Sequence, residues 1–340
     1  MLNKQPTGVG IYCKRLYNQF TKNEKDIGQC RFLFLKEGSL LSLKRYLWNF
    51  FVLPLKAYKS LIYSPSTHGS LFAHKQVITI HDVICLNFPA QHPLQYYYFK
   101  YYVPLLLKKC DKVIAISEFT KSEILKFYKV EESKVKVVYN GVERLNYHGE
   151  TGFEEEVNIL THGNPFFLCV GASYSHKNIE MFIDAIALLD RKDVAFIIVG
   201  KDNEYVDSLK MLAKQKSLSN IIFLNYVSDK LLMSLYKLAL ANVYVSLYEG
   251  FGFPPMEAAS FGTISIVADI PVMREVYGEG VLYVEKSNSA QLSGVLSDVL
   301  TKKYDPKPAV DHLQKLFDRY DWNRCYNEVL KTLKDVDAKK

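Results

Sequence analysis

The sequence has few of the residues that hold small metal-bound or disulfide-bonded folds together. It contains six cysteines among 340 residues, none of which forms a CxxC pair, and its eight histidines do not cluster with them. A structural zinc site is therefore not expected. Scattered cysteines in mostly apolar surroundings instead predict reduced thiols and a cytoplasmic protein.

Long apolar runs are also missing. Residues 1–15 have no apolar core and no cleavage site of small residues, so they do not resemble a signal peptide. No uncharged stretch reaches the roughly 18 apolar residues that a transmembrane helix needs. The net charge of +7 is diffuse and no reader motif is present, so nucleic acid is not expected as a partner. That charge suits an anionic ligand, a membrane surface, or a solvated surface without a particular partner.

What the sequence has is a regular alternation of short β-branched or aromatic runs with segments of helical length. In the first half, strands are predicted at residues 31–35, 77–80, 113–116 and 135–139. In the second half, strands are predicted at residues 166–170, 195–199, 221–224, 243–246, 264–268 and 281–284. Continuous apolar strands separated by helices are typical of parallel sheets covered on both faces. The expected fold class is α/β, with two Rossmann-like, doubly wound domains.

A break in this alternation predicts where the domains meet. Residues 146–163 hold three glycines and a run of three acids, and they interrupt the pattern. We expect an N-terminal domain at residues 1–150, a C-terminal domain at 151–320 and a final helix over 321–340. Ligands of open α/β sheets bind at the carboxyl ends of the strands, so two facing sheets predict a ligand in a cleft between the domains.

The strongest local signal is the segment EGFGFPPME at residues 249–257, which follows a predicted strand and opens a predicted helix. Gly250 and Gly252 permit turns or close approaches that a Cβ would hinder, and the two prolines suit a first helical turn. The N–H groups of that turn would provide a seat for a diphosphate. Glu249 and Glu257 could accept hydrogen bonds from sugar or ribose hydroxyls. The alternative is a glycine turn followed by a glutamate that favours the helix dipole.

This segment resembles the EX7E motif of retaining glycosyltransferases with the GT-B fold, in particular glycosyltransferase family 4. Other segments match that family in order and spacing over nearly the whole chain. They are TGVGIY at residues 7–12, HD at 81–82, VIAISE at 113–118, VYNGV at 138–142, VG at 170–171 with HKN at 176–178, and REV at 274–276. The resemblance implies two domains facing each other across a cleft. It also implies that the last helix, anchored by Trp322, crosses back to the first domain.

The resemblance implies roles for individual side chains. Glu249 would hold hydroxyls of the donor sugar, and Glu257 would hold the ribose of the nucleotide. Lys177 would pair with the diphosphate, where its charge would stabilise the leaving group. His81 would approach the transferred sugar from the other domain, although a lone histidine at a strand end is more often structural.

Backbone contributions are implied as well. Gly8 and Gly10 would let the first loop approach the phosphates, and Gly250, Phe251 and Gly252 would supply backbone N–H groups. Taken alone, a G-x-G pair could be only the turn at a helix start.

Two features depart from the family pattern. Many members carry an Arg near the phosphate-binding Lys, where this chain has Ala172 and His176. His176 would then take over the phosphate contact, or Arg274 would compensate for the missing Arg. Only seven residues precede Gly8, too few for the family's first strand and its loop. We therefore expect the first sheet to lack that strand, or the chain to start late.

The expected function is retaining transfer of a hexose from a nucleotide diphosphate sugar to a saccharide or lipid-linked saccharide acceptor. No metal and no cofactor are expected, because Lys177 and aimed N–H groups would neutralise the diphosphate and no DxD pair stands at a strand end. Bacterial surface-polysaccharide or lipopolysaccharide synthesis uses such reactions. The alternatives are a non-catalytic nucleotide-sugar-binding or scaffold protein of the same fold, and a GT-B epimerase.

Residues 42–63 set four cations among leucines and aromatic rings. When the middle of this segment is wound as a helix kinked at Pro54, these cations fall within one half of the wheel: Lys44, Arg45, Lys56 and Lys59. The pattern predicts either a peripheral contact with an anionic membrane surface or a helix that caps the first sheet with its basic side in water. The tyrosine cluster at residues 96–102 precedes a predicted buried strand, which favours core packing there.

Overall fold

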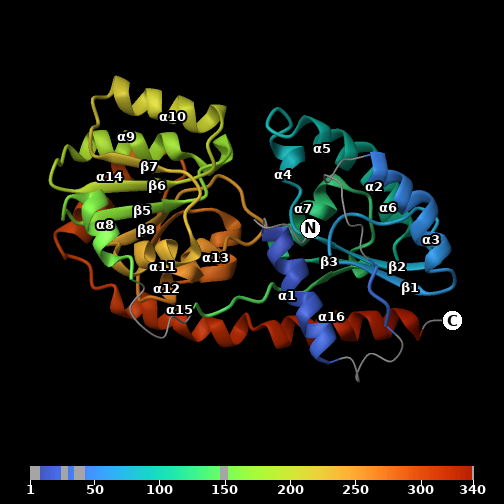
Figure 1. Ribbon diagram of the computed structural model, residues 1–340. Coiled ribbons are helices and arrows are strands. Elements are labelled where there is room, and N and C mark those ends of the chain that lie inside the picture. The colour runs from blue at the N-terminus through green and yellow to red at the C-terminus, as the bar shows by residue number, and fades with distance from the viewer. Residues whose placement is uncertain (1–7, 24–29, 34–42, 146–151, 339–340) are drawn as a thin grey trace. The chain divides into compact units, whose positions relative to one another are not determined.

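The computed structural model describes residues 8–23, 30–33, 43–145 and 152–338. The chain divides into two compact units, and each is built on its own sheet (Figure 1). Unit 1 comprises Met1–Gly141 together with Arg319–Lys340, and unit 2 comprises Val142–Asp318. The last helix therefore belongs to the same unit as the first residues of the chain.

The sheet of unit 1 is wholly parallel. Its order is β1 (Leu61–Ser64), β2 (Lys75–Ile80), β3 (Lys112–Ala115) and β4 (Val135–Val137). The central strands β2 and β3 are buried along almost their whole length, because helices cover both faces of a parallel sheet. Helix α7 (Glu118–Phe127) follows β3, and Ser117 caps it by accepting a hydrogen bond from the N–H of Thr120.

Two helices of unit 1 are interrupted by a widened, π-helical turn. The first runs through α2 (Leu43–Leu47), a wide turn at Trp48–Val52, and α3 (Leu53–Lys56). The second runs through α5 (Pro93–Tyr97), a wide turn at Tyr98–Tyr102, and α6 (Val103–Lys109). In each helix the wide turn ends just before a proline, Pro54 or Pro104. A proline has no N–H and crowds the preceding turn, and the added residue per turn accommodates it.

The final helix packs against the first. Helix α16 (Trp322–Asp337) begins at Asp321, whose carboxylate accepts hydrogen bonds from the N–H groups of Asn323 and Arg324. It shares one apolar cluster with α1 (Gly8–Lys22) and with the sheet. The cluster includes Tyr12, Leu16, Phe20, Val77, Ile114, Trp322, Tyr326 and Val329. Residues 321–337 are therefore held to unit 1 by core packing.

Unit 2 has a six-stranded parallel sheet in the Rossmann order. The strands lie in the order β10 (Leu282–Val284), β9 (Ser265–Ala268), β8 (Ala241–Tyr244), β5 (Phe166–Val170), β6 (Ala195–Val199) and β7 (Ile221–Leu224). The chain runs outward from β5 in one direction and from β8 in the other. The point between β5 and β8 is thus the topological switch of this sheet, where open α/β sheets bind ligands.

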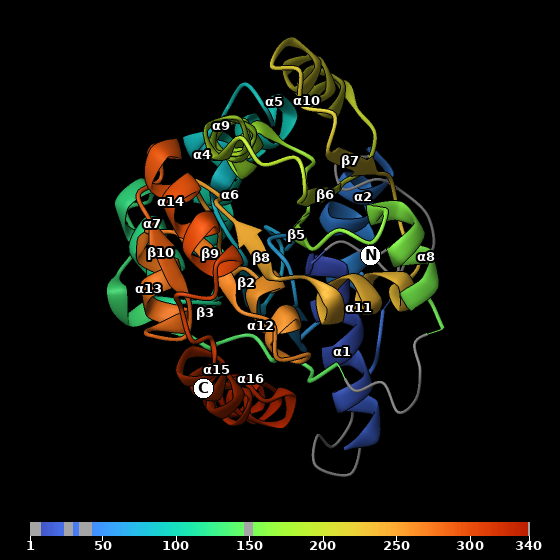
Figure 2. The same ribbon diagram turned by 90° about the vertical axis from the view of Figure 1, so that its left-hand side faces the viewer.

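Helices cover both faces of this sheet (Figures 1 and 2). One face carries α9 (Ile179–Leu189), α10 (Glu204–Gln215) and α14 (Ser289–Leu300). The other carries α8 (Glu154–Thr161), α11 (Asp229–Leu238) and α12 (Pro254–Ala259). The predicted α/β class with parallel sheets is confirmed. Among the helices that the structure describes, none combines the length and the hydropathy needed to cross a bilayer.

Several expected elements differ from the structure. All six strands expected in the second half are present, with ends that shift by at most two residues. In the first half, residues 30–33 form no strand, and the remainder of the strand expected at 31–35 lies outside the described residues, as do residues 1–7. Strand β1 was not expected, because it lies at the end of the segment interpreted as a basic helix. Within the interval 146–163, residues 154–161 form helix α8, which belongs to unit 2.

Two glycines allow a matched test of unit 1. A Cβ on Gly141 would overlap the Trp322 indole ring and lie 2.7 Å from the Trp322 Cα, whereas a Cβ on Gly294 in α14 would meet nothing within 4 Å. Gly141→Ala should lower the free energy of unfolding by about 1–3 kcal/mol through overpacking. Gly294→Ala should raise it by about 0.5–1 kcal/mol, because alanine favours the helix. Urea denaturation measures both, and a Gly141→Ala variant as stable as the native chain would contradict the Trp322 contact.

Candidate active site

Two loops at the switch point of unit 2 are fastened to each other. The loop after β5 ends in a short 3₁₀ turn, Ser175–Lys177, and the loop after β8 leads to Glu249. The N–H of Leu247 donates to the carbonyl of His176 at 2.8 Å. The Asn178 amide donates to the carbonyls of Val245 at 3.2 Å and Lys286 at 2.9 Å. These bonds fix the positions of both loops relative to the sheet.

The centre of the site is an ion pair between Lys177 and Glu249. The Lys177 Nζ lies 2.6 Å from the Glu249 Oε1, and it also donates to the Tyr244 hydroxyl at 3.3 Å. The side chains of Lys177 and Glu249 are only 17% and 13% exposed. The Lys177 ammonium lies 5.2 Å from the centre of the Tyr244 ring. Low exposure makes the pair stronger than a surface ion pair, and it makes either charge costly if left alone.

Two opposing effects set the pKa of Glu249. Burial alone would raise it, because desolvation disfavours the charged carboxylate. The charge and hydrogen bond of Lys177, the hydrogen bond from Tyr244 and the nearby His176 together outweigh burial and hold the pKa of Glu249 below its ordinary value. The carboxylate is therefore ionised at neutral pH. It can accept hydrogen bonds from hydroxyls while Lys177 offers a point charge for phosphate.

Glu257 lies one helix further on, in α12, and has a different environment. Its Oε2 accepts a hydrogen bond from the buried Tyr236 hydroxyl at 2.8 Å. Burial, with a smaller contribution from Asp229, raises the pKa of Glu257 above its ordinary value in spite of that hydrogen bond. The two glutamates of the motif therefore differ in electrostatics: Glu249 is held charged by a cation, and Glu257 is held by a neutral donor.

The glycine turn between the two glutamates is anchored by buried aromatic rings. The Phe251 side chain is buried and packs against Phe253, with ring centres 5.3 Å apart. Gly252 has a φ of +82°, and a Cβ there would lie 2.8 Å from the Met273 Cε, so only glycine fits. Its carbonyl accepts a hydrogen bond from the Tyr277 hydroxyl. The Phe251 side chain thus serves the packing of the turn.

His81 belongs to unit 1, where it follows the end of β2. Its Nε2 lies 3.0 Å from the Pro65 carbonyl. A carbonyl only accepts, so Nε2 carries the proton and Nδ1 keeps its lone pair. The ring stands edge-on to Tyr12, with centres 4.7 Å apart, and the backbone carbonyl of His81 accepts from Thr120 at 3.3 Å. Burial lowers the pKa of His81 to about 4, so the ring is neutral at pH 7.

Gly8 and Gly10 lie in the first turn of α1, which begins at Gly8. The segment expected to be a loop from residue 8 is therefore helical. Gly8 is exposed and Gly10 is buried.

Comparisons with known proteins decide the family. The family described as "Glycosyl transferases group 1" matches residues 151–314, and "Glycosyltransferase Family 4" matches residues 62–144. The chain belongs to glycosyltransferase family 4. The O-antigen chain mannosyltransferase RfbU of Salmonella typhimurium is 33% identical over 236 residues, 69% of this chain. The match spans 64% of the length of that relative. O-antigen chain mannosyltransferase B of Escherichia coli is 24% identical over 317 residues, 89% of this chain and 80% of its own.

Solved structures show the fold of this family 4 member. Anabaena Alr3699/HepE, in complex with UDP and glucose, has a TM-score of 0.76 at 18% identity, covering 98% of this chain and 97% of its own. Sucrose-phosphate synthase from Thermosynechococcus elongatus has a TM-score of 0.74 at 19% identity, covering 98% and 94%. With the two parallel sheets, these matches confirm the predicted GT-B fold.

The structure places the residues that replace the family's Arg. Ala172 is fully buried, and the His176 side chain is 4% exposed and stacks on Tyr174 with ring centres 5.6 Å apart. Arg274 makes two hydrogen bonds of 2.7 Å to Asp269 and lies 3.6 Å from the centre of the Tyr283 ring. Arg274 is thus paired with Asp269, and His176 acts on the Lys177–Glu249 pair through its effect on the pKa of Glu249.

Two residues that contact or position the candidate site are not among those that the sequence predicts. Tyr244 contacts Lys177 and Glu249, yet it stands in a predicted strand, where an aromatic residue indicates core packing. Asn178 joins three loops through its amide, and its φ of +59° is a conformation that asparagine tolerates better than most residues. Asn178 is part of the HKN segment, but only the structure shows that its amide connects these loops.

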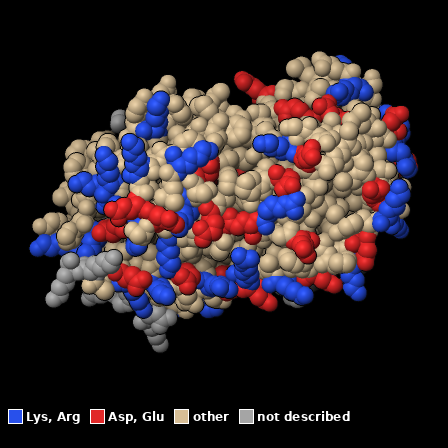
Figure 3. Space-filling model, turned by 180° about the vertical axis from the view of Figure 1, so that it is seen from behind, with Lys and Arg blue, Asp and Glu red and all other residues tan. Residues whose placement is uncertain are grey.

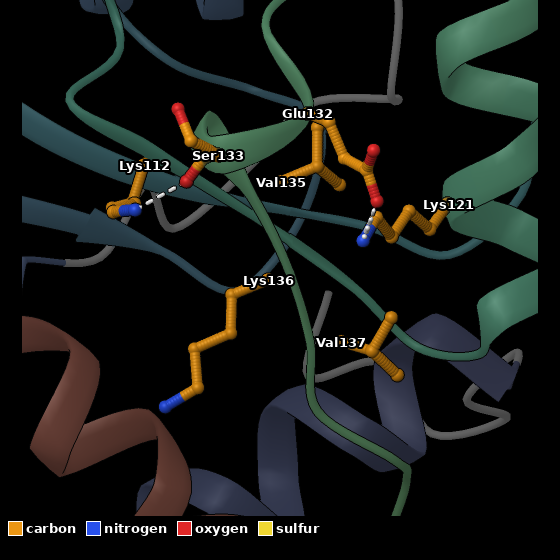
Figure 4. Close-up of a pocket in the computed structure, with 7 residues that line it drawn as sticks. All are labelled: Lys112, Lys121, Glu132, Ser133, Val135, Lys136 and Val137. Atoms are coloured by element: carbon orange, nitrogen blue, oxygen red, sulfur yellow. Dashed lines mark hydrogen bonds and ion pairs between the residues drawn. The ribbon is translucent and has the colours of Figure 1, made fainter.

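Unit 1 also contains a shallow pocket of about 500 Å³, where β3 begins and β4 runs (Figure 4). Its charges are compensated from within the unit: Lys121 pairs with Glu132 at 2.8 Å, and Lys136 pairs with Glu328 at 2.9 Å. His81 follows the opposite, carboxyl end of the parallel strand β2. The pocket is therefore not the candidate site.

Removing the positive charge of Lys177 should reverse the direction in which the pKa of Glu249 is shifted. In Lys177→Met, burial is no longer offset, so the pKa of Glu249 should rise above its ordinary value. In the native chain, the ion pair contributes its full stabilisation when the pH lies above the ordinary pKa of a glutamate. That contribution is lost as the pH falls through the lowered pKa of Glu249. In the variant, stability should fall as the pH rises through the raised pKa. Carboxyl NMR titration and urea unfolding against pH measure this.

The control for this experiment is Lys210→Met, which removes a cation from an exposed pair with Asp202 at 2.9 Å. It should leave the titration of Glu249 unchanged. A Glu249 pKa that stays lowered in Lys177→Met would contradict the electrostatic role assigned to Lys177.

His81 should be neutral throughout the physiological range. Between pH 6.5 and about 4 the unfolded chain binds a proton at this position and the folded chain does not. The contribution of His81 to stability is therefore complete above pH 6.5 and is lost as the pH falls through that interval. His81→Gln should flatten this decline, and the exposed His74→Gln is the control. An imidazole pKa near 6.5 for His81 by NMR would refute the assignment.

Proposed function

We propose that this chain transfers mannose, with retention of configuration, from a nucleotide diphosphate sugar to a saccharide of a bacterial surface polysaccharide. The observation that carries the proposal is the Lys177–Glu249 pair, because it sets a cation and a carboxylate side by side at the switch point of a Rossmann sheet. Relatives named as O-antigen chain mannosyltransferases support the choice of sugar and pathway.

The chemistry proposed is displacement at the anomeric carbon. The bond from C1 of the sugar to the diphosphate oxygen breaks, and its electrons stay on the diphosphate. The acceptor hydroxyl forms the new bond to C1 on the same face from which the diphosphate departs, so the configuration is retained, and it gives its proton to the departing diphosphate. Lys177 stabilises the charge that develops on the leaving group, and its low exposure makes that charge more effective than in water.

We assign the other residues to binding. Glu249 accepts hydrogen bonds from hydroxyls of the sugar, and Glu257 accepts from the ribose. The N–H groups of residues 250–252 and of the first turn of α1, which includes Gly8 and Gly10, face the phosphates. His81 presents its carbonyl or its Nδ1 to the transferred sugar, and His176 supports the negative charge of Glu249.

The reaction is proposed to need no metal, because Lys177 and backbone N–H groups supply the positive field that a divalent cation would otherwise give. Turnover that survives excess EDTA supports this, and turnover restored only by added Mg²⁺ or Mn²⁺ refutes it. Retention is tested by the anomeric configuration of the product in ¹H NMR, starting from an α-linked donor.

We place the reaction on the cytoplasmic side of the membrane, with the acceptor saccharide carried on a lipid. All six cysteines are free, and five are buried, which suits a reducing compartment. A donor made in the cytoplasm and an acceptor held in the lipid would meet at that surface.

The donor class is identified by thermal shift with GDP, UDP and ADP and their hexose sugars, since a ligand of the folded state raises its melting temperature. GDP-mannose and UDP-glucose are then offered with a lipid-linked saccharide extract. Release of nucleotide diphosphate with a larger saccharide supports transfer. Stabilisation without release would indicate a non-catalytic binding protein, and conversion of the donor to an epimer would indicate an epimerase.

Substitution of the central pair should abolish transfer but not folding. Lys177→Ala should lower kcat on the order of 10²–10³-fold, because it removes a charge aimed at the leaving group. Glu249→Ala should cause a comparable loss, with the thermal melting transition retained. Lys210→Ala is the matched control. Near-native turnover in both site variants would disprove the proposed role of the pair.

A further inference from the structure

Exposed apolar side chains gather on the two interrupted helices of unit 1. Phe51 and Leu55 on the first helix are 61% and 77% exposed, and Tyr58 in the turn that follows it is 73% exposed. On the second, Leu94, Tyr97 and Tyr101 are 71%, 58% and 61% exposed. These six residues are called the aromatic surface below. Scattered exposed leucines are normal, but large apolar residues that recur on two joined helices indicate an interaction site.

The two helices are joined by aromatic contacts. The Phe50 ring lies 5.6 Å from Phe72 and 5.9 Å from Tyr102, measured between ring centres. Phe50 therefore connects the wide turn of one helix to the wide turn of the other. Its neighbour Phe51 is left exposed.

The tyrosines of the second helix divide into an inner and an outer set, which corrects the expectation of core packing for residues 96–102. Tyr98 and Tyr102 donate their hydroxyls to the carbonyls of Thr67 at 3.0 Å and Gly69 at 3.2 Å. Tyr97 and Tyr101 instead stack on each other in solvent, with ring centres 6.2 Å apart. Tyr98 and Tyr102 hold the helix to the loop at Thr67 and Gly69 through these hydrogen bonds. Within the part of the chain that the structure describes, Tyr97 and Tyr101 make no such contact with the core, so core packing does not explain why they are aromatic.

The charge of this region has one sign. Between residues 38 and 110 the sequence has a single acidic residue, Asp82, and eight basic ones. They are Lys44, Arg45, Lys56, Lys59, Lys75, Lys100, Lys108 and Lys109. Figure 3 shows the basic side chains in blue and the acidic side chains in red on one face of the molecule.

Three of these lysines lie over the aromatic rings. The Nζ of Lys56 is 5.4 Å from the centre of the Trp48 ring, and that of Lys59 is 5.5 Å from Tyr58. Lys100 is 5.5 Å from Tyr101. Aromatic rings with ammonium groups beside them suit the boundary between lipid chains and headgroups.

We propose that the aromatic surface docks on an anionic lipid bilayer, with its rings and leucines among the headgroups and its lysines on the lipid phosphates. An anionic bilayer matches both halves of the pattern, since it offers apolar depth and a continuous negative charge. The docking deepens the proposed function, because it would bring the chain to an acceptor carried on lipid.

The test is cosedimentation of the purified chain, without donor or acceptor, with two kinds of vesicle. One contains equal parts of phosphatidylglycerol and phosphatidylcholine, and the other contains phosphatidylcholine alone. We expect binding to the anionic vesicles that weakens as salt is added, because screening reduces the attraction. Equal binding to both vesicles, or to neither, would overturn the proposal.

Two variants separate the apolar and electrostatic parts. Replacing Leu55, Tyr58, Tyr97 and Tyr101 by serine should weaken binding about tenfold or more, because less apolar area enters the interface. Changing Lys56, Lys59 and Lys100 to glutamine should weaken it roughly a hundredfold, since each cation near the surface contributes about fivefold.

The matched control is Ile159→Ser with Leu188→Ser, which removes two leucine-sized side chains of unit 2 that are 67% and 59% exposed. It should leave vesicle binding unchanged. Sedimentation velocity without vesicles tests whether a second copy of the chain, and not a bilayer, covers the aromatic surface. A native dimer that dissociates in the serine variant would assign the surface to a second copy and overturn the proposal.

The outcome does not depend on activity. Glu249→Ala should bind vesicles as well as the native chain, and the serine variant should keep its turnover with a water-soluble saccharide acceptor. If the native chain bound anionic vesicles but transferred no sugar, the result would count against the proposed function alone. Loss of vesicle binding with transfer intact would leave the proposed function in place.

Discussion

The candidate site depends on one contact, the 2.6 Å ion pair between Lys177 and Glu249. A pair this shielded is a poor source of stability, because the desolvation of two charges offsets most of their attraction. The pair instead provides a pre-formed arrangement of charges, in which separating the two partners would leave each one shielded from water without a counter-charge. A ligand that draws Lys177 toward a diphosphate must also give Glu249 a donor. A sugar hydroxyl next to the diphosphate meets that requirement, and a bare diphosphate does not.

The surrounding structure keeps this arrangement rigid. Asn178 ties the lysine loop to the strands beside it, and the Leu247 N–H ties the glutamate loop to His176. Below the glycine turn, Tyr277 holds the carbonyl of Gly252, whose positive φ only glycine adopts without strain. Positioned groups that do not reorganise during the reaction are the main source of electrostatic catalysis.

The sequence was informative at positions where the residue type alone indicates the local structure. Apolar runs bounded by helices located the six strands of unit 2, and a glycine between two glutamates located the turn. The sequence was silent where tertiary context decides. Tyr244 has the pattern of a core residue, and its hydroxyl matters only because β8 lies beside β5. In unit 1, strand β1 is four residues long and adjoins a basic segment, so it has too little periodicity to be recognised.

The tyrosine cluster shows the same limit. Seven residues of nearly uniform chemistry, YYYFKYY, contain no signal that separates an inner from an outer face. The separation arises from the wide turn before Pro104, which changes the angular spacing along the helix. A standard helical wheel therefore misplaces these side chains, and the same holds for the segment around Pro54.

The chain passes between its units twice, at Gly141–Val142 and at Asp318–Arg319. Within unit 1, Tyr139 packs against Tyr320 with ring centres 5.4 Å apart. Within unit 2, the Arg144 guanidinium lies 4.9 Å from the Phe317 ring centre and donates to the Gln314 carbonyl at 3.2 Å. The two passages are thus held beside each other on both sides, so a change in one must be accommodated by the other. Gly141 stands at this point because the Trp322 ring leaves no room for a Cβ, which makes this glycine a requirement of the double connection.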